Sequence, residues 1–153
     1  MKSIRRIAFA FCMFALTAAT GALAANTGVG TLTLPPPFAS SPILAWSWGA
    51  SNSGTSHTGG GGGSGMANIQ DVSLTRFTDA QSPLFFQAVA TGATIASVVL
   101  TTGPVTMTLE NVLVTSFSTG GSGEKSMTEN ITLNFAKVTY SVGGVSAGFD
   151  YQQ

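Results

Sequence analysis

Residues 105–117 read Val-Thr-Met-Thr-Leu-Glu-Asn-Val-Leu-Val-Thr-Ser-Phe, and this stretch decides the fold class. Val105, Met107 and Leu109 alternate with polar residues, which is the period-two pattern of a strand with one buried face. From residue 112 to residue 117 the apolar strand continues with its phase shifted. Because β-branched and aromatic residues separated by Gly and Ser turns also dominate the rest of the chain, we predict an all-β domain.

Strands of the same kind are predicted on both sides of this stretch. Residues 43–53 read as a strand running into a turn, and two indoles on one face of it, Trp46 and Trp48, are expected in the core. Residues 67–77 alternate with a bulge or bend between the apolar positions 69 and 72. Residues 131–135 place their apolar side chains on one face and residues 138–142 on the other. A strand of this kind is expected to leave one layer and enter another contact.

One segment breaks the strand pattern and predicts a short helix. Ser82 is suited to the N-cap, Pro83 to the first helical position, and Gly92 can close the helix. The segment Thr101-Thr102-Gly103-Pro104 then reads as a tight turn between strands.

The N-terminal segment has the features of a secretory signal peptide. Lys2, Arg5 and Arg6 precede an apolar run, and Ala22-Leu23-Ala24 supplies the small residues that a signal peptidase needs. We expect residues 1–24 to be the signal peptide and residues 25–153 to be one domain, secreted or periplasmic in a bacterium. The remaining chain then carries three basic against six acidic residues and no cysteine. This composition excludes disulfides and disfavours nucleic-acid binding, which needs a basic face.

Two glycine-rich loops stand out, at residues 57–65 and residues 118–123. The first could be a flexible linker, but the mature chain before it is too short for a separate domain, so we interpret it as a long loop of a single β domain. Ordering such a loop costs entropy, and contact with another subunit would offset that cost. The chain has few charged residues, 8% of the total, which suits a protein whose surface is used in assembly.

Catalytic motifs are weak. The glycines at residues 59–65 are followed by Met66, so the lysine of a phosphate-binding loop is missing. The match Gly144-Val145-Ser146-Ala147-Gly148 resembles a nucleophile elbow, but we interpret it as a Gly/Ser turn because the chain ends before a helix could follow. His57 is the single histidine and is expected to be a loop or interface residue. We therefore expect no enzyme activity, no cofactor and no metal site.

Several motifs, in order, resemble the haemolysin-coregulated protein (Hcp) family, which builds the inner tube of the bacterial type VI secretion system. They are Leu44-Ala45-Trp46-Ser47-Trp48-Gly49, then residues 68–77 with Gln70-Asp71 and Thr75-Arg76-Phe77, then residues 112–123, residues 128–138, and Gly148-Phe149-Asp150. The resemblance covers roughly residues 43–150.

The resemblance implies a two-sheet β-barrel or sandwich with one short flanking helix, a ring of six subunits, and rings stacked into a tube that is itself secreted. It implies three kinds of partner besides the chain itself, namely spike proteins, sheath proteins and small effectors carried in the tube. The expected assembly contacts are Ser53, His57, Gly59, Gly60, Gly61, Gly62, Gly63, Ser64, Gly65, Ser118, Gly120, Gly121 and Gly123.

The chain departs from the family pattern at its N-terminus. The family begins without a signal peptide, and here Pro35, Pro36 and Pro37 require that any first strand end near Leu34, because proline cannot donate a ladder hydrogen bond. An exported paralogue that acts as a binding or adhesive module outside the tube is therefore the alternative.

Overall fold

A computed structural model describes residues 28–54, 65–121, 123 and 126–152, and the predicted signal peptide lies outside these residues. Within the described residues the chain forms ten strands and one helix, which confirms the mainly β class with a single short helix. In chain order the elements are β1 (Gly30–Thr33), β2 (Ser41–Ile43), β3 (Ala45–Ser47), β4 (Ala50–Asn52), β5 (Ala67–Ile69), β6 (Val72–Phe77), α1 (Ser82–Thr91), β7 (Thr94–Thr102), β8 (Val105–Gly120), β9 (Thr128–Val142) and β10 (Val145–Asp150).

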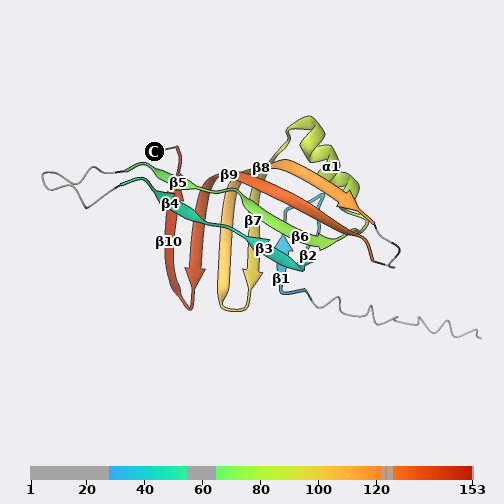
Figure 1. Cartoon of the computed structure of the whole chain (residues 1–153), viewed down its shortest axis with the longest axis horizontal. Helices are drawn as coiled ribbons and strands as arrows, with labels where there is room; N and C mark the ends of the chain where they lie inside the picture. The colour runs from blue at the N-terminus through green and yellow to red at the C-terminus, as the bar shows by residue number, and fades with distance from the viewer. Residues whose placement is uncertain (1–27, 55–64, 122, 124–125, 153) are drawn as a thin grey trace, which may run out of the picture.

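The two long strands β8 and β9 organise the molecule. They pair with each other along almost their whole length, and β9 pairs on its other edge with β6 over residues 128–133 and with β10 over residues 137–142. The main sheet runs in the order β2-β1-β7-β8-β9-β6-β3, with β10 attached to β9. Figure 1 shows that the sheet bends over on itself. The backbone N–H of Leu44, between β2 and β3, donates to Thr75 O at 2.8 Å, so the two ends of the sheet meet in a nearly closed barrel.

The phase shift predicted in residues 105–117 occurs where β8 bends. Leu109 and Val112 are both fully buried although they are three residues apart, and Asn111 between them has a φ of 52°. One residue in the left-handed region turns the following side chains to the opposite face, and Asn tolerates this region better than most residues. In β9, Phe135 and Val138 are buried on either side of a similar change of face. Both strands therefore keep apolar side chains in the core while they pass from one layer to the other.

Helix α1 covers the side of the barrel next to β8, as Figure 1 shows. Its Phe85 is fully buried, and Gly92 closes it in the left-handed conformation with φ 66° while donating to Ala88 O at 3.0 Å. The predicted N-cap was wrong by one residue. Gln81 occupies the cap without a side-chain hydrogen bond, and Ser82 is the first helical residue, where its Oγ accepts the Asp79 N–H at 3.0 Å.

Other sequence interpretations also need correction. The single strand expected in residues 43–53 is divided among three short strands. They are separate because each has a different partner: β2 pairs with β1, β3 with β6 and β4 with β5. Trp46 and Trp48 were expected in the core, but they are half-buried and pack against it from the outside. The segment from Gly144 to Gly148 is mostly strand, since β10 begins at Val145 and only Gly143 and Gly144 form the turn. The turn expected over residues 101–104 is shorter, because β7 continues to Thr102 and only Gly103 and Pro104 separate it from β8, and the first strand ends at Thr33, near Leu34 as expected.

Candidate functional site

The stem of the first glycine-rich loop is held by one side chain, Asn52, at the end of β4. Its Nδ2 donates to Gly65 O at 3.2 Å, and its Oδ1 accepts the Gly54 N–H at 2.6 Å. Ser53 is exposed between them. The antiparallel pairing of β4 with β5 ends at Asn52 opposite Ala67, so the amide fixes the two chains where the ladder stops. The predicted contacts His57, Gly59–Gly63 and Ser64 lie outside the described residues.

The stem of the second glycine-rich loop is the end of the β8–β9 hairpin. Ser118 and Gly120 belong to β8, Gly121 and Gly123 follow it, and all four are exposed. Next to them Met127 lies close to Gly121, where an added Cβ would be 3.4 Å from the methionine Cγ. The predicted glycine contacts that the structure describes therefore lie at solvent-facing stems.

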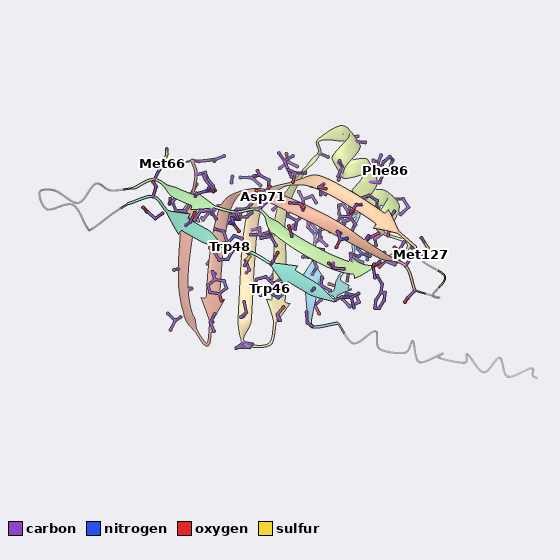
Figure 2. The ribbon with its side chains drawn as sticks, viewed as in Figure 1. Trp46, Trp48, Met66, Asp71, Phe86 and Met127 are labelled. Atoms are coloured by element: carbon purple, nitrogen blue, oxygen red, sulfur yellow. The ribbon has the colours of Figure 1, made fainter. Side chains whose placement is uncertain are left out.

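The two stems do not form one site. Met66, which adjoins Gly65, and Met127 lie at opposite ends of the longest axis of the molecule (Figure 2). Both methionines are exposed, Met66 by 86% and Met127 by 48%. The structure thus places an exposed stem at each end of the domain, and the two stems differ in sequence.

A partly exposed aromatic pair on α1 and β8 was not predicted from the sequence. Phe86 is 62% exposed and contacts the ring of Phe117 edge-on, with 6.4 Å between the ring centres. The signal was the dipeptide Phe85-Phe86, because two consecutive helical residues cannot both face the core. Phe85 takes the inward position, and Phe86 is left on the surface of α1 (Figure 2).

A buried ion pair was also missed. Arg76 on β6 lies opposite Glu129 on β9, and both side chains are fully buried. The Nε of Arg76 is 3.2 Å from Glu129 Oε1, and it donates a hydrogen bond to Phe77 O at 3.3 Å. The guanidinium also contacts the Asp79 carboxylate and lies 5.0 Å from the centre of the Phe85 ring. Arg76 therefore joins β6, β9 and the start of α1.

The chemistry available elsewhere is limited. Among the residues that the structure describes, no three His, Cys, Asp or Glu side chains are grouped as a metal site would require. A surface cavity of about 420 Å³ lies between residues 35–38, α1 and the start of β7. Its lining is apolar apart from Gln87 and Thr94, so it offers no acid or base for catalysis. Within the described part of the chain, no helix has the length and hydrophobicity needed to span a membrane.

These observations define a small, nearly closed β-barrel with one flanking helix, glycine-rich surfaces at both ends and, among the described residues, no group of three His, Cys, Asp or Glu side chains that could hold a metal ion. The family described as "Type VI secretion system effector, Hcp" matches residues 39–142. The chain belongs to this Hcp family of the bacterial type VI secretion system.

Individual relatives agree with the family. Protein hcp1 of Pseudomonas aeruginosa strain PAO1 is 46% identical over 81 residues, an alignment that covers 46% of this chain and 50% of that protein. The chain thus spans about half the length of the curated relative it matches.

Solved structures have the same fold. A type six secretion system protein superposes with a TM-score of 0.72 at 19% identity, covering 81% of this chain and 96% of that one. A type VI secretion system effector from Yersinia pestis gives a TM-score of 0.63 at 20% identity, covering 79% of this chain and 98% of the other. A variant of the Hcp1 protein from E. coli EAEC 042 gives 0.65 at 18% identity, covering 81% and 99%.

Proposed function

We propose that this protein is a structural subunit of the type VI secretion tube. In this proposal six copies close into a ring, rings stack into the inner tube, and the tube is secreted with small effectors in its lumen. The observation that carries the proposal is the family match over residues 39–142, which runs from just before β2 to the end of β9 and so includes most of the barrel.

The shape and surface of the domain support stacking. Heterologous assembly needs two different surfaces on each copy, and the stems near Met66 and Met127 are two such surfaces at opposite ends. Charged residues make up only 8% of the chain. Among them Arg76 and Glu129 are buried, and Glu110 and Lys137 form a half-exposed pair at 3.6 Å. Few charges have to lose water when copies of such a surface meet.

The glycine loops are the proposed contacts between rings. Residues 53–65, with His57 among them, would reach the next ring, and residues 118–123 would present glycines at the opposite end. Spike and sheath proteins are the further proposed partners.

The test is the oligomeric state of the protein without residues 1–24. We expect light scattering to give the mass of six copies and electron microscopy to show rings with a central hole. A protein that stays monomeric at every concentration tested would contradict the proposal.

The signal-like segment at residues 1–24 favours a second candidate, an exported paralogue that acts in the periplasm or medium outside the tube. The two candidates differ in their route of secretion. If the protein is a tube subunit, deleting a sheath gene should stop its release into the medium. Release that continues unchanged in the deletion strain would favour the paralogue.

A further inference from the structure

A surface hollow of about 490 Å³ lies where β8 and β9 bend. Its lining includes Thr94, Asn111, Leu113 and Asn134 from the sheet and Tyr151 and Gln152 from the end of the chain. Thr94, Leu113 and Asn134 form one cross-strand row over β7, β8 and β9. Beside this row Asn111, with its φ of 52°, turns β8, so the hollow lies at the bend of the sheet. Its volume is in the range of sites that hold small molecules.

The end of the chain forms one wall of the hollow and is fixed there by two hydrogen bonds. The backbone N–H of Tyr151 donates to Ala136 O at 2.9 Å, in the gap along the edge of β9 between its pairing with β6 and its pairing with β10. The Tyr151 hydroxyl donates to Ile69 O at 2.9 Å, so the chain ends beside β5, as Figure 1 shows. Tyr151 is still 49% exposed. A ring held in this way loses little conformational entropy when a ligand packs on it.

The polar groups of the hollow are amides and a hydroxyl. Three side-chain amides line it, those of Asn111, Asn134 and Gln152, and each amide carries both donors and an acceptor. Asn134 is held in place because its Nδ2 donates to Asp71 Oδ1 at 2.9 Å, and its Oδ1 remains an acceptor. None of the lining residues, all within the described part of the chain, is charged. The hollow therefore suits a neutral ligand with several N–H, O–H and C=O groups.

We infer that this hollow binds a neutral oligosaccharide of N-acetylated hexose units. The C–H groups of a pyranose ring form an apolar face that packs on the ring of Tyr151, while the side-chain amides pair with its hydroxyl and acetamido groups. An extended peptide fits less well, because it binds by adding to an open strand edge, and on this edge Ala136 O already accepts the N–H of Tyr151. The inference goes beyond the proposed function and does not depend on it.

The test is a titration, followed by NMR, of the protein as the bacterium processes it. The first probe is chitotriose, a linear trimer of N-acetylglucosamine, and the second is cellotriose, which has the same linkage without the acetamido groups. The third is trialanine with its N-terminus acetylated and its C-terminus amidated, which carries amides without a pyranose ring. We expect chitotriose to bind, cellotriose to bind about fivefold more weakly for the loss of one hydrogen-bonding group, and the peptide not to bind.

The decisive variant is Asn111→Gly, because glycine adopts a φ of 52° without strain and removes the amide. Its control is Gln87→Ala, at an exposed amide on α1 that does not line the hollow. We expect Asn111→Gly to weaken chitotriose binding about fivefold, Tyr151→Ala to weaken it about tenfold, and Gln87→Ala to leave it unchanged. Circular dichroism shows whether each variant is folded.

Mapping on the wild type needs no variant and decides the matter if a variant fails to fold. The backbone and side-chain amide signals that move with chitotriose should belong to residues 111, 134, 136 and 152. Signals that move elsewhere in the protein, or chitotriose binding that is equally tight in folded Asn111→Gly, would overturn the site. Peptide or cellotriose binding as tight as that of chitotriose would overturn the class of ligand.

The outcomes separate this inference from the proposed function. If the protein forms rings and chitotriose does not bind to it, the saccharide site is wrong and the tube proposal stands. If the protein is monomeric throughout and chitotriose binds in the hollow, the tube proposal fails and the saccharide site stands.

Discussion

Removing the charge of Glu129 should destabilise the barrel strongly. Glu129→Gln leaves the guanidinium of Arg76 fully buried without the carboxylate opposite it. Breaking a buried ion pair in this way costs about 3–5 kcal/mol. Asp79 still contacts Arg76, but its side chain is 40% exposed, so it compensates only in part. We therefore expect a loss of about 3 kcal/mol, which corresponds to a decrease in Tm of about 6–12 °C for a domain of this size.

Replacing both partners should cost much less than replacing one. The oxygens of Glu129 accept no hydrogen bond of good geometry within the described residues, so the pair is incompletely satisfied. The desolvation of both charges is then poorly compensated, and an apolar pair of similar volume is often as stable or more stable. We expect the double variant Arg76→Met, Glu129→Leu to unfold at the same denaturant concentration as the wild type, with the methionine sulfur against the Phe85 ring.

The assay is urea unfolding at one fixed protein concentration, because assembly makes stability concentration-dependent. Fluorescence of Trp46 and Trp48 reports on the barrel. Arg76→Met and Glu129→Gln complete the comparison with the double variant. The reasoning is refuted if Glu129→Gln unfolds within about 1 kcal/mol of the wild type, or if the double variant loses as much as the two single changes added together.

Three further predictions concern single residues. Phe85→Ala should cost about 3–5 kcal/mol in thermal unfolding because the ring is fully buried, whereas Phe86→Ala, at 62% exposure, should stay within about 0.5 kcal/mol; equal losses would contradict the orientation of α1. Gly92→Ala should cost about 1–2 kcal/mol, since φ at this position is 66° and nothing crowds an added Cβ; an unchanged melting temperature would exclude the left-handed cap. Asn52→Ala should speed proteolysis between residues 54 and 65, as measured by mass spectrometry of the fragments. Ser53→Ala should not, because Asn52 and not Ser53 makes the hydrogen bonds to Gly54 and Gly65 on the two sides of the loop stem.

Much of the fold follows from local pattern in the sequence. Alternation predicts β8 and β9, and the phase shift predicted from residue 112 corresponds to the bend that the structure places at Asn111. Proline and glycine predict the limits of the helix to within one residue, since their backbone preferences are local. The strand expected from residue 43 was misjudged because its breaks depend on which distant strands it has to pair with.

The buried ion pair shows why some features could not be predicted from the sequence. Arg76 follows Val72 and Leu74 at inward positions of one strand, and Glu129 precedes Ile131 on another. Each position alone suggests a buried charge, which would be costly without a partner. Only the register between β6 and β9, which joins residues 53 positions apart, places the two opposite each other.

The continuity of β8 and β9 through both layers has a consequence for folding. Because β8 and β9 run through both layers of the barrel, neither layer can unfold while the other stays folded. We therefore expect a single all-or-none transition, approached slowly because most contacts join distant parts of the chain. Such a polypeptide would reach its final structure more slowly after synthesis than a helical domain of similar length.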